Sequence, residues 1–388
     1  MRTLIRVRGE AWTLVLASLA LSILGVYAID VASGPHEGLS SLATRQIAFL
    51  GAGLFLGLIA AAVHFRILIA ASWLLYGASL ALLIFLLVPG VPASIVTPRN
   101  GARAWIDLGP VNLQPSEFAK IAVVIVLAQY LRFRSNHRRF LGFIPPAVIA
   151  GVPAALVVLE PDLGMASLFA PALFAMLIAA GAKMRHILAV LVLGAALAPA
   201  VYPFLMPHQK ERIVALVRQT QGDLTLQDSS QFQSLKAMTL AGAGGAAGLP
   251  SEHSRVLIDL NDLPEAHNDM VFAVIVNRFG MLGGLSVLAL TFIWLLSASI
   301  AAARTNDPFG RLIIVGLAAM FATQTIINVG MSLGVLPIIG LTLPFVSYGG
   351  SSLLSSYLGV GLIVSVAARP NRRLARRSFE FGADTSED

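Results

Sequence analysis

The chain has 388 residues, of which 57% are hydrophobic and only 12% are charged, and it contains no cysteine. Its mean hydropathy of +0.80 excludes an ordinary soluble protein, and the lack of cysteine excludes disulfides and thiol chemistry. The formal charge of +7 would suit a nucleic-acid partner, but its distribution along the chain indicates membrane topology instead. We therefore expect no nucleic-acid partner.

Apolar runs that could cross a bilayer, for which about 20 residues are needed, recur along the whole chain. We count ten such runs: 11–30, 46–63, 67–88, 118–132, 141–159, 164–182, 186–206, 270–302, 309–334 and 345–368. They predict an all-α integral membrane protein with about ten transmembrane helices, forming one polytopic domain over residues 1–388. The first run has a basic flank but no clear cleavage site, so we expect a retained anchor and not a signal peptide.

The basic residues predict the orientation of these spans. An even number of spans puts both termini on one side, and placing them inside leaves 17 of the 27 Lys and Arg residues in inner segments. Because cytoplasmic loops are enriched in Lys and Arg, both termini are predicted to be cytoplasmic, including a tail of residues 369–388. The long loop 207–269, between spans 7 and 8, is then extracytoplasmic.

Acids, amides and hydroxyls beside the spans gather on this external face. Glu117 and Lys120 share a helix face at the start of one span, where they form a local ion pair or, through Lys120, meet an anionic group at the outer rim. Glu160 and Asp162 flank a proline at the end of another span, which suits an N-cap by Asp162 or a cation site. A site on this face would act on something outside the cytoplasm.

The long outer loop carries three further features. Residues 209–217 predict a short amphipathic helix on the membrane surface. The Gly/Ala-rich residues 241–248 lack the strand and helix that a dinucleotide fingerprint requires, and no organic cofactor is expected. Asp269 stands where the chain re-enters the bilayer, and an ionisable side chain at that position is a functional candidate. Its structural alternative is the N-cap of the helix that follows.

The last apolar stretch cannot be one continuous helix. Residues 334–352 contain Pro337, Pro344 and a Ser-Tyr-Gly-Gly-Ser-Ser run that includes Ser347 and Ser351. Proline removes a backbone donor and Gly-Gly favours turns, and irregular backbone at membrane depth must line a protein-walled or watery cavity. This break predicts a site, and the alternative is an ordinary loop between two helices.

Together these motifs resemble the SEDS family of shape, elongation, division and sporulation proteins, which includes RodA, FtsW and SpoVE. The matching stretches follow the family order: 104–109, 114–120, 160–164, 209–212, 233–234, 263–269, 328–337 and 344–352. The resemblance implies a peptidoglycan glycosyltransferase of the bacterial cytoplasmic membrane. Such a protein joins lipid II disaccharides to a growing glycan strand at the outer face, among membrane lipids, and works with a class B penicillin-binding protein, a transpeptidase.

The resemblance also implies roles for individual residues. Asp269 matches the catalytic aspartate of the family and would orient or deprotonate the acceptor hydroxyl. Candidates for binding the substrate or its leaving undecaprenyl diphosphate are Arg103, Lys120, Arg212, Glu117, Ser347 and Ser351. Glu160 and Asp162 are the candidates for holding a divalent cation, Mg²⁺ or Mn²⁺. Asn277 and Arg278 depart from the family, which usually has two acids there, so any metal or partner role of those acids is in doubt.

Two functions of other classes stay open. A lipid II flippase should place polar residues at mid-membrane on both sides of a barrier, in paired repeats with broken helices. A non-catalytic scaffold for a cell-wall synthase would suit the change at Asn277 and Arg278. The polar residues gathered on one face favour the glycosyltransferase. Chain length and short tails lean toward RodA, serving elongation, whereas residues 263–267 are as common in FtsW, serving division.

Overall fold

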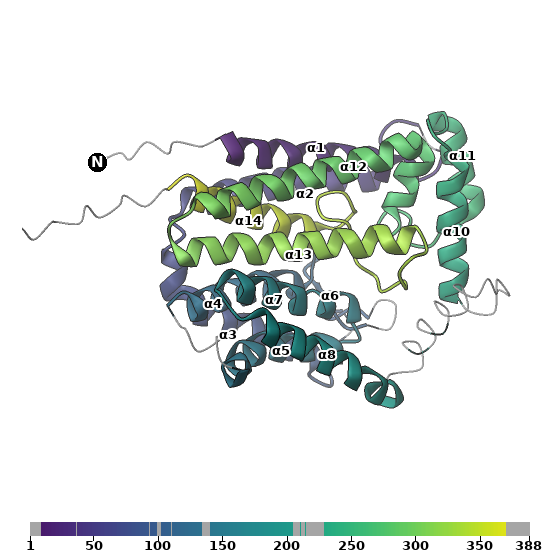
Figure 1. Cartoon of the computed structure of the whole chain (residues 1–388). Helices are drawn as coiled ribbons and strands as arrows, with labels where there is room; N and C mark the ends of the chain where they lie inside the picture. Colours follow the sequence, from purple (N-terminus) through teal and green to yellow (C-terminus); the bar gives the residue numbers. More distant parts are fainter. Residues whose placement is uncertain are drawn as a thin grey trace, which may run out of the picture.

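The computed structural model describes residues 9–35, 37–92, 94–98, 102–109, 111–133, 140–204, 210, 214 and 229–369. The regular secondary structure of these residues is helical apart from two short antiparallel strands, β1 (Ile106–Asp107) and β2 (Asn112–Leu113). The predicted all-α class is therefore confirmed (Figure 1). The helices are α1 (Gly9–Ala32), α2 (Ser41–Ala62), α3 (Ile67–Leu87), α4 (Pro115–Leu131), α5 (Ile144–Leu159), α6 (Leu163–Ser167), α7 (Phe169–Ala179), α8 (Met184–Val201), α10 (Ser229–Ala243), α11 (Ser251–Asn261), α12 (Val271–Arg304), α13 (Pro308–Ser332) and α14 (Gly350–Ala367), with 3-10 turns η2 (Phe140–Phe143) and η3 (Tyr202–Phe204).

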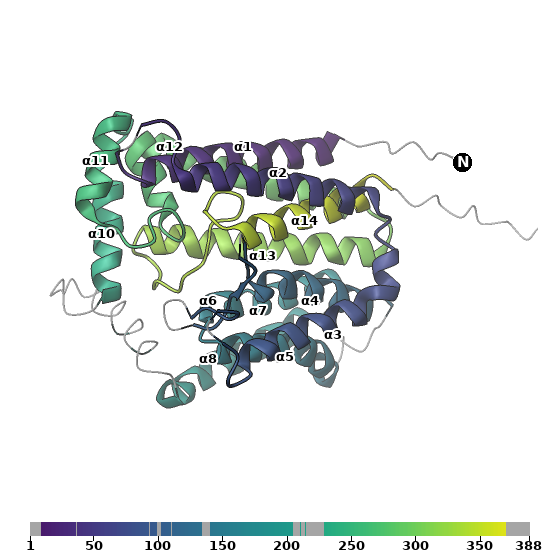
Figure 2. The ribbon, with the colours of Figure 1, turned by 180° about the vertical axis from the view of Figure 1, so that it is seen from behind.

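Each of the ten predicted apolar runs contains helix. Among the described residues, seven helices are long and apolar enough to cross a membrane: α1, α2, α3, α5 together with part of η2, α12, α13 and α14. The remaining apolar helices, such as α7 and α8, are shorter or interrupted, so the count of ten spans stays a prediction. The start of α1 and the end of α14 lie at the same end of the bundle, and α10 and α11 stand across the other end (Figures 1 and 2).

The bundle packs around α4 and α13. Residues 119–128 of α4 are all buried, so this helix is enclosed by its neighbours and shows no lipid-facing stripe. The most extensive helix contacts pair α2 with α14, α1 with α12 and α3 with α4. In the first pair a Cβ on Gly361 would lie 2.2 Å from the carbonyl oxygen of Gly57, a backbone approach that only small residues permit.

The predicted break between the last two helices is confirmed. Residues 333–349 leave α13, turn back into the bundle and join α14 without helical backbone (Figure 2); we call them the re-entrant segment. At its deepest part Val346 meets α1, where a Cβ on Gly25 would lie 2.3 Å from the Val346 carbonyl oxygen. Glycine at position 25 therefore lets the segment enter the bundle.

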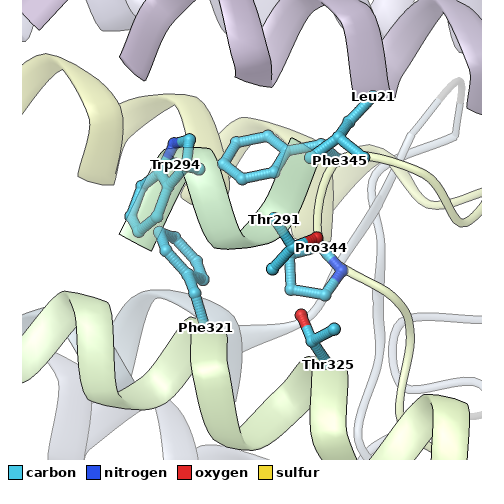
Figure 3. Close-up of a pocket in the computed structure, with 7 residues that line it drawn as sticks. All are labelled: Leu21, Thr291, Trp294, Phe321, Thr325, Pro344 and Phe345. Atoms are coloured by element: carbon cyan, nitrogen blue, oxygen red, sulfur yellow. The ribbon is translucent and has the colours of Figure 1, made fainter. Parts of the chain in front are cut away.

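An aromatic anchor holds the inner side of the re-entrant segment. Phe345 adopts φ +66°, a conformation costly for a residue with a side chain. Its ring lies 5.9, 5.5 and 5.6 Å, centroid to centroid, from those of Trp294, Phe321 and Tyr357. Beside these rings is a cavity of about 10 Å³ (Figure 3), which holds at most one water molecule. This side of the segment is thus packed against aromatic rings.

A kink in α12 receives the Gly/Ala-rich stretch. Gly280 has φ 69° and ψ −164° inside the helix, and a Cβ there would lie 2.4 Å from Ala246. The backbone amide of Met281 donates to the Gly245 carbonyl at 2.9 Å. Backbone of the outer loop therefore replaces the helical hydrogen bonds that the kink interrupts, and the stretch is a docking element between α10 and α11.

Candidate active site

Asp269 is the last residue but one before α12. It lies at the end of a turn, residues 263–270, and is half-buried. The N-cap of α12 is Met270, with no side-chain cap hydrogen bond, so the alternative reading of Asp269 as an N-cap is wrong. Asp269 thus lies just outside the helix, one residue before the N-cap.

The turn is held by three successive backbone carbonyls, those of residues 267, 268 and 269. Each accepts one hydrogen bond from the re-entrant segment or from α13. The donors are the Tyr348 amide to His267 at 2.9 Å, Ser347 Oγ to Asn268 at 2.6 Å, and Asn328 Nδ2 to Asp269 at 2.8 Å. The position of Asp269 is thus set by residues far away in the sequence.

Gly340 of the re-entrant segment faces the carboxylate. A Cβ at this position would lie 3.5 Å from Asp269 Oδ2, and its φ of +74° favours glycine. On the other side, a Cβ on Gly164 of α6 would lie 3.3 Å from the Gly340 carbonyl oxygen. The backbone of the re-entrant segment at Gly340 therefore lies between α6 and the Asp269 turn and contacts both.

A cavity of about 180 Å³ hollows the outer side of this turn. Three acids line it, Asp259, Asp262 and Glu265, together with His267 and residues 32–34 at the end of α1. Burial lowers the pKa of His267 and outweighs the opposing effect of Glu265. The imidazole is therefore neutral at pH 7, and the cavity carries negative charge.

Glu117 and Lys120 form a buried ion pair. Lys120 Nζ lies 2.6 Å from Glu117 Oε2, and the two side chains are 2% and 1% exposed. Ser355 Oγ donates to the same Glu117 oxygen at 2.6 Å, and Lys120 Nζ donates to Gln324 Oε1 at 3.4 Å. The expected ion pair is confirmed, but the expectation that Lys120 lies at the outer rim is wrong, because the pair is enclosed between α4, α13 and α14.

Gln324 links this ion pair to the re-entrant segment. Its Nε2 donates to the Thr342 carbonyl at 2.8 Å and to Thr342 Oγ1 at 3.1 Å. One turn later on α13, Asn328 Nδ2 donates to the Leu341 carbonyl at 2.6 Å as well as to Asp269. Gln46 of α2 holds the far side of the segment by donating to the Ser347 carbonyl at 3.0 Å.

Asp162 and Glu160 differ in their surroundings. Asp162 Oδ1 accepts from the Met165 amide at 3.0 Å and caps α6, as predicted, while Oδ2 accepts from Gln114 Nε2 at 3.1 Å. Glu160 is 1% exposed, and neither of its carboxylate oxygens has a hydrogen-bond partner. Burial, and then the charge of Asp162, raises the pKa of Glu160 to about 8.

The remaining described candidates contact the protein's own backbone. Ser351 Oγ donates to the Asn112 carbonyl at 2.9 Å and accepts from the Gln114 amide at 3.0 Å. Ser351 and Ser347 are thus already engaged by backbone groups. Arg103 is half-buried and donates to the Val91 carbonyl at 3.2 Å. Arg212 and most of the predicted helix 209–217 lie outside the described residues.

Comparison with known proteins identifies the chain. The family model that covers FtsW, RodA and SpoVE, described as cell cycle protein, matches residues 10–372. The chain belongs to the FtsW/RodA/SpoVE family. It is 31% identical over 363 residues to a protein named probable peptidoglycan glycosyltransferase FtsW of Saccharophagus degradans, covering 92% of this chain and 91% of the relative. It is also 31% identical to stage V sporulation protein E of Bacillus subtilis, covering 90% and 93%.

Solved structures of family members share the fold. One, described as coordinating polymerization and crosslinking by a peptidoglycan synthase complex, matches with a TM-score of 0.77 and 33% identity over 92% of this chain and 97% of that chain. The rod shape determining protein RodA of Thermus thermophilus matches with a TM-score of 0.66 and 29% identity, over 92% and 96%. The chain is a multi-pass protein of the bacterial cytoplasmic membrane.

The departure from the family at residues 277 and 278 has a structural role. Asn277 is fully buried and accepts from Ser254 Oγ at 2.6 Å while donating to the Leu240 carbonyl at 2.8 Å. Arg278 Nε donates to Tyr27 Oη at 3.0 Å. Asn277 and Arg278 thus join α10, α11 and α1 to α12.

Sequence reasoning missed the buried amides Gln46, Gln324 and Asn328. A signal was present in α13, since Gln324 and Asn328 stand four residues apart on one face of an otherwise apolar helix. Such buried amides require partners. Their partner, the re-entrant segment, could not be read from spacing alone.

Proposed function

We propose that this chain polymerises glycan strands from lipid II at the outer face of the cytoplasmic membrane, as a peptidoglycan glycosyltransferase. The observation that carries the proposal is Asp269, a half-buried ionisable residue at the end of the turn 263–270. Its backbone carbonyl accepts from Asn328, and its carboxylate faces Gly340 of the re-entrant segment. The names of the relatives, probable peptidoglycan glycosyltransferase FtsW, support the same activity.

In the proposed reaction the acceptor sugar's 4-hydroxyl attacks the anomeric carbon of the growing strand. A bond forms between that oxygen and the anomeric carbon, and the bond from the carbon to the diphosphate breaks with inversion. The hydroxyl proton passes to the Asp269 carboxylate, and undecaprenyl diphosphate leaves. General-base assistance of this kind contributes about 10²–10⁴-fold to a rate.

The leaving diphosphate needs positive charge, for which Arg103 and Arg212 remain the proposed contacts. Lys120 contributes only if its ion pair with Glu117 opens. The serines are proposed to act through backbone contacts, since Ser347 Oγ and Ser351 Oγ both bond main-chain groups. These roles follow from the resemblance.

A divalent cation is part of the proposal, and Glu160 with Asp162 would hold it. Within the described residues no group of three or more acidic or histidine side chains gathers to bind a metal ion. Mg²⁺, however, is often held by one or two carboxylates together with substrate phosphates. The unpartnered oxygens of Glu160 fit such a site. When bound, the ion would offset negative charge on the departing diphosphate.

A transpeptidase of the class B penicillin-binding proteins is the proposed partner. A structural relative is described as a synthase complex that coordinates polymerization with crosslinking, which supports a similar pairing here. Depletion of this protein in cells, followed by microscopy, would assign it to division or to elongation. Chains of undivided cells would indicate a role in division, and rounded cells a role in elongation.

Strand synthesis from lipid II by the purified protein, with and without its transpeptidase, tests the proposal. We expect polymer from the wild type and little or none from Asp269→Asn, which keeps size but loses basicity. Because Asn has the size of Asp and keeps hydrogen-bonding groups, this variant should still be stably inserted in the membrane. A fully active Asp269→Asn protein would overturn the catalytic assignment and favour the scaffold, and lipid II movement without polymer would favour the flippase.

A further inference from the structure

Asn328 lies in the middle of the contacts that locate Asp269. It is fully buried in α13, and its Nδ2 donates to two carbonyls, that of Asp269 at 2.8 Å and that of Leu341 at 2.6 Å. Both partners are acceptors, so the orientation of the amide is fixed by chemistry. A single side chain thus ties the turn 263–270 to the re-entrant segment.

One tied point is the backbone of Asp269 itself, and the other adjoins the backbone that faces its carboxylate. Leu341 follows Gly340, whose Cα faces Asp269 Oδ2. By donating to the carbonyls of both Asp269 and Leu341, Asn328 fixes the distance between the Asp269 carboxylate and the backbone at Gly340 that faces it. Ser347 Oγ supports the same turn one residue earlier, at Asn268.

The side-chain amide of Asn328 lowers the stability of the fold in one respect. Asn328 Oδ1 is buried without a hydrogen-bond donor, and an unsatisfied buried acceptor destabilises a fold. An apolar side chain of similar size would avoid this cost but would leave the carbonyls of Asp269 and Leu341 without their donor. Such exceptions in a native core call for an explanation, and the location of Asn328 beside Asp269 supplies one.

We infer that Asn328 is a positioning residue, which holds the Asp269 backbone against the re-entrant segment so that the carboxylate meets the acceptor hydroxyl. The inference rests on the proposed catalytic role of Asp269. A misplacement of about 1 Å at a reacting group costs about 10²-fold in rate. Loss of the amide should therefore lower kcat and leave KM for lipid II nearly unchanged.

The test compares Asn328→Ala with Ser332→Ala in the full-length protein. Ser332 lies one turn later on α13, is equally buried and donates only to the Asn328 carbonyl within its own helix, at 3.0 Å. Both variants lose one buried hydrogen-bonding side chain. We expect kcat to fall by about 10²-fold in Asn328→Ala and by less than about twofold in Ser332→Ala, with similar melting temperatures for the two variants.

Hydrogen exchange gives a readout apart from activity. Peptides that span residues 263–271 should exchange faster in Asn328→Ala than in Ser332→Ala, because the turn has lost a fixed contact. Unchanged exchange and unchanged kcat in Asn328→Ala would overturn the inference, and so would a fall in melting temperature that accounts for the lost activity. If instead Asp269→Asn is fully active, the proposed function itself fails, and the two failures are thereby told apart.

Discussion

At the scale of the residue, burial decides what the charged side chains can do. The side chains of Lys120 and Glu117 are at most 2% exposed, and each is the other's counter-ion. Removing one partner of a buried pair leaves an uncompensated charge. This separates Lys120 from Arg103, which is only half-buried.

The Lys120→Ala variant is therefore expected to lose stability as well as activity. We expect a loss of roughly 3–5 kcal/mol, seen as a lower melting temperature in detergent. The double variant Glu117→Gln/Lys120→Met should recover most of that stability, because no unpaired charge remains buried. If Lys120→Ala loses polymerisation while its melting temperature is unchanged, the lysine serves the diphosphate directly.

Glu160 predicts a pH dependence of stability. Its pKa is about 8 in the folded protein, above the ordinary value of a carboxyl, so between about pH 4.5 and 8 the folded state binds more protons than the unfolded state. Stability from this group is thus present at low pH and is lost as pH rises through about 8. With EDTA present, the wild-type melting temperature should fall from pH 6 to pH 9, and that of Glu160→Gln should fall less.

The same measurement tests the proposed cation. Adding Mg²⁺ at pH 9 should restore the wild-type melting temperature, because an ion held at Glu160 compensates its charge. It should not affect Glu160→Gln. If Mg²⁺ affects both proteins equally, no specific cation binds at Glu160.

At the scale of the element, the re-entrant segment depends on the small residue that faces it. A Cβ on Gly25 would lie 2.3 Å from the Val346 carbonyl oxygen, whereas a Cβ on Gly77 of α3 would have no neighbour within 4 Å. Both glycines lie inside helices, so alanine improves helix propensity equally at the two positions. They differ only in what the new methyl group meets.

Gly25→Ala is expected to displace the segment and, through it, the Asp269 turn. Polymerisation should fall at least tenfold, by about 1.4 kcal/mol or more in the activation free energy, with helix content in circular dichroism retained. Gly77→Ala should stay active and equally or slightly more stable. Equal activity in the two variants would mean that the segment accommodates the extra methyl group without consequence for catalysis.

At the scale of the whole molecule, one end of the bundle differs from the end that holds both described termini. The hairpin of α10 and α11, the kink of α12 and the Asp269 turn all gather at one end (Figures 1 and 2). Arg255 joins this hairpin to α1, with Nη2 2.5 Å from Asp30 Oδ2. The predicted orientation would place this end outside the cytoplasm.

The predicted orientation can be measured with reporter fusions. Fusions at the C-terminus and in the connection 133–140 should read cytoplasmic, because the inner segments carry most of the Lys and Arg residues. A fusion near Gly222 should read external. An external C-terminus would require an odd number of spans and would move the Asp269 turn to the other face.

The sequence by itself determined the helical membrane class, the break near Pro344 and the candidacy of Asp269. Each depends on local properties, namely apolar runs, proline and glycine chemistry, and an ionisable residue at a span's edge. It also predicted the cap by Asp162, since a cap involves residues only three apart.

Only the tertiary structure decided which of these residues are buried and what holds them. Lys120 is buried because α13 and α14 pack against it. The N-cap is Met270 and not Asp269, because the turn 263–270 packs on the re-entrant segment. The carbonyl of Asp269 finds its donor, Asn328, 59 residues away. Contacts of that separation are fixed by packing of the whole bundle and leave no local pattern in the sequence.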